Sequence, residues 1–394
     1  MASGRPPHWL DDSLTRARRV VIRHLAAIGQ TFFVYDPWVG LAAVIVLAVA
    51  APHLAVAGMI ASVIARVTAE CAGVSSAFLD TGLVELNGWF LGLACATFFA
   101  VGPSLAVSLV LGGVLVSGLS IVMYRVLAAW EIPLVIGPYV PAFWLLWSAL
   151  TTFAWNKVAV LPTIPPAPAA PLLVILLGGL RGVGQIFFLP NAAVGVGLAI
   201  AASIADRRLG VAMVGASIAA VGMGHLAGTP AWQVEAGLAG FTAALIAAAA
   251  LRRFAGIGVA AVAITIVTIP FLEAAALRLA GAVGVHALSA PYVWLVWTFA
   301  LLRRPGDPDR SITDRPRGRG ADSSGAPGSG PPLPLMMLTT ARSSFTKLLD
   351  LTFPEMTSLK SKYGLFPFSY FPLLATVILI NSMPGMSGGF SSLG

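Results

Sequence analysis

The sequence predicts an all-α polytopic membrane protein. We expect two inverted repeats of about five transmembrane helices each, with half-spanning pore helices around a central pore. Three observations lead to this fold class. Of the 394 residues, 58% are hydrophobic and only 10% are charged, whereas soluble domains carry about 25% charged residues. The pattern of the first half of the chain returns in the second half, and arginines cluster between the apolar stretches.

Composition also excludes several functions. A mean hydropathy of +0.88 excludes both a soluble enzyme and a disordered polymer. The formal net charge of +8 would suit a nucleic-acid partner, but arginines placed between membrane segments are better explained by topology, so we expect no such partner. Cys71 and Cys95 form no metal motif, and the chain has no phosphate-binding loop. We therefore expect no enzymatic activity, no cofactor and no bound metal.

An internal duplication organises the chain. Gly-Gln-Thr-Phe-Phe at 29–33 returns as Gly-Gln-Ile-Phe-Phe at 184–188, 155 residues later. Gly-Leu at 82–83 returns with the same offset, and Pro-Tyr-Val at 138–140 returns at 291–293, 153 residues later. Three blocks that return in the same order indicate a tandem repeat.

The duplication and the changes in composition divide the chain into six regions. They are a cytoplasmic N-terminal segment with an interfacial helix (1–33), a first transmembrane repeat (34–160), a Pro-rich connector (161–178), a second transmembrane repeat (179–304), a disordered linker (305–334) and a C-terminal tail of unassigned role (335–394).

Each region has its own sequence signal. The N-terminal arginines are followed by no uninterrupted apolar core and cleavage site, which favours an amphipathic helix at 16–30 over a signal peptide. Proline makes the connector stiff and extended, and Gly, Pro and Ser are typical of a disordered linker. In the tail, residues 364–383 form an interfacial or an additional membrane segment. The apolar segments are expected at 34–51, 54–67, 82–101, 105–122 and 138–153 in the first repeat, and at 192–204, 211–226, 234–250, 257–272 and 291–302 in the second.

Arginine distribution predicts the orientation of the chain in the membrane. An odd number of spans in each half inverts the second half relative to the first. The turns assigned to the side of the N-terminal arginines hold most of the positive charge, and the other side receives only Lys157, Arg181 and Arg278. The positive-inside rule then places both ends of the repeats in the cytoplasm, in a multi-pass protein of the cell (inner) membrane. In inverted repeats the functional site lies near the midplane, between the halves.

The paired blocks give the sequence a family resemblance. In addition to the blocks at 29–33 and 184–188, Leu-Asn-Gly follows at 86–88, and Ile-Pro-x-x-Ile-x-Pro-Tyr at 132–139 is paired with Val-His-x-x-Ser-x-Pro-Tyr at 285–292. In these blocks the chain resembles the urea transporter family, which includes the bacterial urea channels, over about residues 20–302. The resemblance implies a homotrimer with one pore in each protomer and passive flow of urea or a related small amide. It also implies a flattened slot with apolar walls and a ladder of oxygen acceptors along one edge.

The blocks supply candidate residues for the solute pathway. Gln30 and Gln185 each carry an amide oxygen that can accept a hydrogen bond from a solute, although a helix–helix hydrogen bond is the alternative. Phe33 and Phe188 would form the faces of the slot, unless they face lipid or the core. The resemblance adds four wall residues, for which ordinary core packing is the alternative: Leu86, Phe90, Phe241 and Leu245.

The third block departs from the family pattern. Where the family has threonine in both copies, this chain has Ile136 and Ser289. The change removes one hydroxyl from the expected constriction and keeps the other. His286 replaces the second proline of the signature and is either a polar or gating group or a structural hydrogen-bond partner.

Carboxylates inside apolar segments leave two other functions open. Glu85, Glu131, Glu235 and Glu273 lie in or beside such segments, and Glu85 is the best candidate for a polar or gating role. An ion-coupled secondary transporter would need one of them to bind the ion. The third possibility is a structural membrane subunit that has lost transport.

Overall fold

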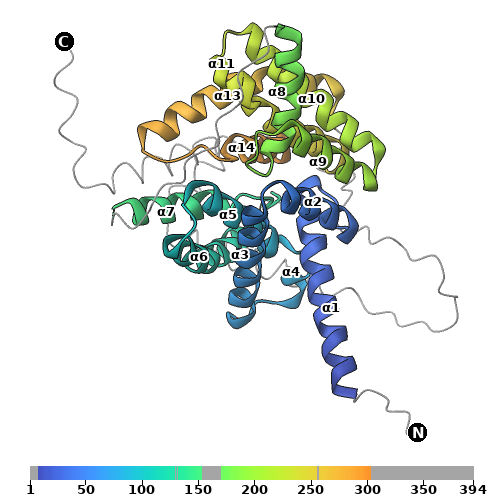
Figure 1. Ribbon diagram of the computed structural model, residues 1–394, viewed down its shortest axis with the longest axis vertical. Coiled ribbons are helices and arrows are strands. Elements are labelled where there is room, and N and C mark those ends of the chain that lie inside the picture. The colour runs from blue at the N-terminus through green and yellow to red at the C-terminus, as the bar shows by residue number, and fades with distance from the viewer. Residues whose placement is uncertain (1–7, 129, 131, 153–169, 255–256, 303–394) are drawn as a thin grey trace, which may run out of the picture. The chain divides into compact units, whose positions relative to one another are not determined.

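The computed structural model describes residues 8–128, 130, 132–152, 170–254 and 257–302 (Figure 1). The chain forms two units, residues 1–317 and 318–394, and all described residues belong to the first. The described part contains helices and no strand, so the predicted all-α class is confirmed. The predicted linker and the tail lie outside the described residues.

Among the described residues, the first half of the chain forms seven helices and one short 3-10 turn. They are α1 (His8–Gly29), η1 (Gln30–Phe32), α2 (Pro37–Ala50), α3 (Pro52–Cys71), α4 (Ser76–Leu79), α5 (Leu83–Phe98), α6 (Pro103–Ala128) and α7 (Tyr139–Thr152), coloured blue to teal in Figure 1.

The second half repeats this order from green to orange. It comprises α8 (Pro171–Gln185), α9 (Ala192–Ala205), α10 (Arg207–Leu226), α11 (Ala231–Ala236), α12 (Leu238–Arg252), α13 (Val259–Ala282) and α14 (Ala290–Leu302). Helices α2 and α9 pack against each other, which joins the two halves.

Helix length separates spanning from shorter elements. By length and apolar composition, α3, α6, α10 and α13 are candidate membrane spans, and the pair α1 and α2, bent by 83°, would be a fifth. This is fewer than the expected five in each half. Five further apolar helices of the described part have only 10–17 residues, short of the ~20 residues that cross a bilayer. The chain is thus a multi-pass membrane protein that contains both long candidate spans and shorter apolar helices.

The connector is shorter than its composition suggested. Helix α8 begins at Pro171, within the stretch assigned to the connector, and continues into the second repeat. Proline suits the first position of a helix because its missing N–H has no partner there in any case. The apolar run Leu-Leu-Val-Ile-Leu-Leu that follows at 172–177 is then helical. The rest of the connector, up to 169, lies outside the described residues.

In both halves the chain bends in the same way after the first helix. Phe33 and Phe188 have φ angles of 58° and 62°, in the left-handed region that ends a helix. The next helix is then capped by Asp36 in the first half and by Asn191 in the second, whose side chains each accept hydrogen bonds from two backbone N–H groups of the first turn. The bend and restart are therefore encoded locally, twice, at one offset.

Two glycines allow these bent pairs to pack closely. A Cβ atom at Gly40 would lie 1.7 Å from the backbone oxygen of Leu25, and one at Gly195 would lie 1.8 Å from the backbone oxygen of Leu180. No side chain fits at these distances without moving a backbone. Helices α1 and α2, and likewise α8 and α9, approach so closely because both positions are glycine.

Gly195→Ala should therefore destabilise the protein by about 1–3 kcal/mol, because overpacking forces backbone shifts. The free energy of unfolding in detergent micelles measures this effect. Gly215→Ala, in α10, is the matched control, since beyond its chain neighbours and the backbone of its own helix no described atom lies within 4 Å of its added Cβ. The control should be neutral or stabilising by up to about 1 kcal/mol, as alanine favours a helix over glycine. If the two variants are equally stable, helices α8 and α9 lie farther apart at Gly195 than the 1.8 Å approach of its added Cβ indicates.

Candidate functional site

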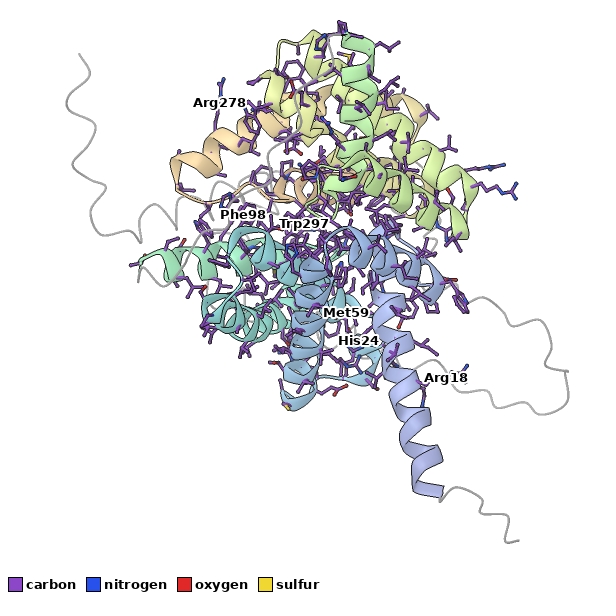
Figure 2. All side chains as sticks on the ribbon, in the orientation of Figure 1. Arg18, His24, Met59, Phe98, Arg278 and Trp297 are labelled. Atoms are coloured by element: carbon purple, nitrogen blue, oxygen red, sulfur yellow. The ribbon has the colours of Figure 1, made fainter. Side chains whose placement is uncertain are left out.

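The turns that precede α7 and α14 are joined by a reciprocal contact between the halves. The indole N–H of Trp144 donates to the backbone oxygen of His286 at 2.7 Å, and that of Trp297 donates to the backbone oxygen of Pro133 at 3.0 Å. Trp297 follows Trp144 by 153 residues, and His286 follows Pro133 by the same number. Each half thus makes the same contact with the other. Figure 2 labels Trp297 at this place. The third sequence block lies at the meeting point of the two halves.

Asn87 holds the first of these turns. Its side-chain oxygen accepts from the N–H of Tyr139 at 3.1 Å, and its amide nitrogen donates to the backbone oxygen of Val135 at 2.9 Å. Val135 has a φ of 43°, and its equivalent Leu288 has a φ of 50°. A branched side chain in this region is strained and persists only where its surroundings hold it. Both signature turns therefore have the same unusual backbone.

Tyr139 connects the two signature turns through its hydroxyl. The hydroxyl donates to Oγ of Ser289 and accepts a hydrogen bond from the Ser289 N–H at 3.1 Å. Both residues are buried, and so is Ile136 at the other signature position. The one hydroxyl that the signature positions retain is thus bound by a tyrosine from the opposite half.

An aromatic cluster lies beside this contact. Phe187 is at its centre, with ring centroids 6.5 Å from Phe32, 5.8 Å from Trp89 and 6.0 Å from Phe90. Phe90 in turn lies 5.4 Å from the ring of Tyr139. The cluster joins α5, η1 and the turn after α8, so it contains residues of both halves.

The fully buried ring of each Phe-Phe pair lies one position before the predicted slot face. Phe32 and Phe187 are fully buried, whereas Phe33 and Phe188, predicted as the slot faces, are only partly buried. The left-handed backbone at Phe33 and Phe188 redirects the second ring of each pair. The signal for the missed rings was present in the sequence, because both copies contain two consecutive phenylalanines. Of the wall candidates, Leu86, Phe90, Phe241 and Leu245 are all buried on α5 and α12.

The two glutamines occupy equivalent places. The amide nitrogen of Gln30 donates to the backbone oxygen of Thr81, and that of Gln185 donates to the backbone oxygen of Ala236 at 3.4 Å. Thr81 and Ala236 each precede the glycine that caps the start of the next helix, α5 or α12. Each bond therefore holds the chain where a helix begins. The amide oxygen of Gln30 is buried and has no described partner, which leaves an unused acceptor. Such an oxygen fits the acceptor role expected for Gln30.

A second aromatic group surrounds His286. Its imidazole stacks on Phe98 with centroids 3.9 Å apart and an interplanar angle of 20°, and the ring of Trp147 meets it edge-on at 4.6 Å. Phe188 approaches Phe98 at 6.3 Å. Figure 2 labels Phe98 at this place. His286 and Phe188, two of the expected site residues, thus both contact Phe98.

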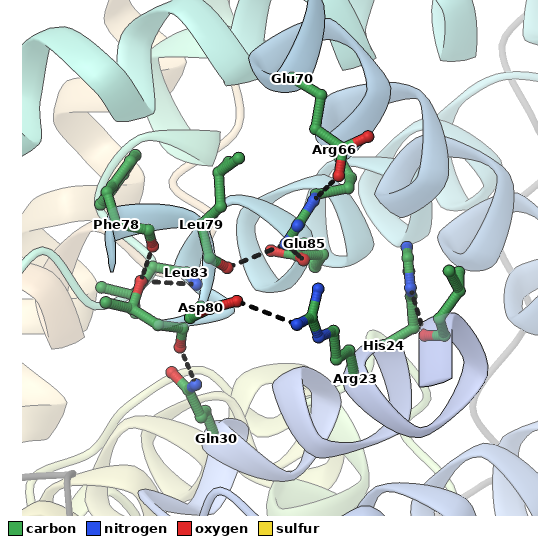
Figure 3. A network of polar contacts seen from close by, with 12 residues as sticks. Arg23, His24, Gln30, Arg66, Glu70, Phe78, Leu79, Asp80, Leu83 and Glu85 are labelled. Atoms are coloured by element: carbon green, nitrogen blue, oxygen red, sulfur yellow. Dashed lines mark hydrogen bonds and ion pairs between the residues drawn. The ribbon is translucent and has the colours of Figure 1, made fainter. Parts of the chain in front are cut away.

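Glu85 lies in a network of ion pairs rather than alone. The Arg66 guanidinium lies 2.6 Å from Oε1 of Glu85 and 2.6 Å from Oε1 of Glu70, and it also donates to the backbone oxygen of Leu79 at 2.9 Å (Figure 3). Glu85 is almost completely buried. A buried carboxylate with a paired arginine needs no ion for neutralisation. Through Arg66, Glu85 is linked to the backbone of the turn between α4 and α5.

Glu273 is a carboxyl group in a different environment. It is buried on α13 and accepts a hydrogen bond from the hydroxyl of Thr242. It also lines a small pocket with Thr229, Gln233 and Pro270. Within the described ranges, no three His, Cys, Asp or Glu side chains are close enough to hold a metal ion.

Comparison with protein families identifies the chain. The family model described as Urea transporter matches residues 22–304, which covers both halves, every expected site residue and the reciprocal contact between the signature turns. A comparison with curated proteins returns no match for this chain. The family is one of transporters rather than enzymes, and its name gives urea as the solute. With most of its length matched, the chain belongs to the urea transporter family.

Proposed function

We propose that the protein is a passive channel for urea or a similar small uncharged amide, with a pore between two inverted halves. The observation that carries this proposal is the reciprocal contact of Trp144 and Trp297 with the opposite signature turns. A contact made identically in both directions is what a two-fold axis produces. Inverted repeats related in this way place a substrate site at their interface.

The chemistry at that interface suits urea. Urea is planar, and its faces can slide between apolar or aromatic walls while its N–H groups bind oxygen acceptors at the edge. Leaving such polar groups unpaired costs about 1–3 kcal/mol each. The unused amide oxygen of Gln30 is one acceptor in this setting. The proposed pathway contains Gln30, Phe33, Leu86, Phe90, Ile136, Gln185, Phe188, Phe241, Leu245 and Ser289, with His286 and Glu85 as neighbouring polar groups.

The proposal also includes the assembly and the membrane topology of the protein. The family resemblance supports a homotrimer with one pore in each protomer. The arginine distribution supports insertion in the inner membrane, surrounded by lipid, with both ends of the repeats in the cytoplasm. The inverted arrangement also predicts that Gln30 and Gln185 lie across one central pathway.

Ion coupling is the second candidate, and it depends on Glu273. Glu85, the carboxylate that the sequence favoured for this role, is paired with Arg66. Glu273 instead lies on a membrane helix beside a pocket, bonded to one hydroxyl. Intramembrane carboxyl groups often mark ion or proton pathways. This observation keeps a secondary transporter as the alternative.

Stopped-flow urea uptake into proteoliposomes tests both candidates. A channel should raise urea permeability above that of empty liposomes, with no response to a proton or sodium gradient. Glu273→Gln should leave this flux unchanged. Flux that follows an ion gradient and is lost in Glu273→Gln would instead establish the secondary transporter. Permeability equal to that of empty liposomes would indicate that the protein is a structural membrane subunit without transport activity.

A further inference from the structure

The hydrogen bonds between Tyr139 and Ser289 determine how the serine hydroxyl is used. The phenol oxygen of Tyr139 accepts the N–H of Ser289, and a backbone N–H can only donate. The second bond runs from the phenol O–H to Oγ of Ser289. A phenol is far more acidic than a serine hydroxyl and is the better donor. In this pair the serine oxygen therefore accepts a hydrogen bond, and its own O–H is available to donate to another partner.

No described residue accepts a hydrogen bond from the Ser289 O–H. Ser289 Oγ donates to no acceptor among the described residues, although it is buried. A buried hydroxyl with an unused proton favours a ligand that brings an acceptor. A carbonyl oxygen is such an acceptor, whereas the N–H groups of an amide are not.

We propose that Tyr139 is a positioning residue that makes Ser289 a hydrogen-bond donor, so that this point of the pathway selects solutes with a carbonyl oxygen. The inference rests on the proposed channel function and adds a second type of recognition to it. Gln30 accepts hydrogen bonds from the N–H groups of the solute, and Ser289 donates one to its oxygen. Thiocarbonyl sulfur, a weaker acceptor than oxygen, should be discriminated against.

The repeat supplies an internal comparison. Tyr292 is the equivalent of Tyr139 and is also buried, but the equivalent of Ser289 in the first half is Ile136, which has no hydroxyl. The tyrosine–serine pair therefore exists on one side only. Tyr292→Phe is a matched control for Tyr139→Phe, because both changes remove one buried phenol oxygen and keep the ring.

The test compares urea with thiourea in proteoliposomes. In Tyr139→Phe the ratio of urea to thiourea permeability should fall by about threefold to tenfold, the effect of about one hydrogen bond. Ser289→Ala should lower the ratio to the same extent, and the double variant should lower it no further. In Tyr292→Phe the ratio should stay within twofold of that of the unchanged protein. Because each ratio is taken within one variant, a general loss of folded protein cancels.

A binding measurement separates this inference from the channel function. Tyrosine labelled with ¹³C at Cζ gives one signal for each of the six tyrosines, and Tyr139→Phe and Tyr292→Phe assign the two of interest. In lipid nanodiscs, urea should move the Tyr139 signal, with a smaller shift from thiourea and none at Tyr292. Flux equal to that of empty liposomes would reject the channel, and the inference would then depend on this shift. An unmoved Tyr139 signal, or an unchanged ratio in a conducting Tyr139→Phe variant, overturns the inference.

Discussion

Ile136→Thr should raise urea permeability by about threefold to tenfold. Ile136 occupies the signature position equivalent to Ser289, in a turn whose backbone has the same left-handed residue as its counterpart. A solute that passes there exchanges water for protein partners, and one missing hydroxyl costs about 0.5–1.5 kcal/mol. That cost corresponds to the stated change in rate. Threonine restores the hydroxyl and also removes part of the isoleucine volume.

Two further variants make this result interpretable. Ser289→Ile removes the remaining hydroxyl and the partner of Tyr139 and adds volume, so it should nearly abolish urea flux. Leu119→Thr, on α6 and outside the signature turns, should leave flux unchanged. Urea permeability is measured by stopped flow on equal amounts of inserted protein. If Ile136→Thr conducts like the unchanged protein, the first signature turn does not form the rate-limiting barrier.

Arg66→Ala should destabilise the protein by about 3–5 kcal/mol, because it leaves a buried carboxylate without its partner. The Glu85 side chain is only 1% exposed, and that of Arg66 is 11% exposed. Arg66 also donates to the backbone oxygen of Leu79, so the variant loosens the turn that precedes α5. The free energy of unfolding in detergent micelles measures the loss.

The control for this prediction is a second ion pair of the same turn. Arg23 and Asp80 lie 3.3 Å apart, but their side chains are 48% and 49% exposed. Arg23→Ala should therefore cost about 0–1 kcal/mol. The double variant Arg66→Met with Glu85→Met should recover most of the stability, since a buried pair can be replaced by apolar side chains. Similar losses for Arg66→Ala and Arg23→Ala would mean that water reaches Glu85.

The sequence alone was sufficient for the class of protein, the duplication and the family. Hydrophobicity is a sum over neighbouring residues, and a repeat is visible as letters at one offset, so neither requires knowledge of the packing. The same applies to the restart of α2 and α9, where Asp36 and Asn191 act on the N–H groups of their own first turn. The signature positions Ile136 and Ser289 were located in this way, and their role in the pathway stays a prediction.

Only the tertiary structure decided which side chains meet. It buried Phe32 and Phe187 in place of the second ring of each pair, because the backbone turns left-handed at that second residue. It paired Glu85 with an arginine on another helix, and it joined Tyr139 to a serine 150 residues away. Periodicity along one helix contains no information about the neighbouring helix. The partners of a buried polar group depend on how the two halves pack, and they therefore had to be found in three dimensions.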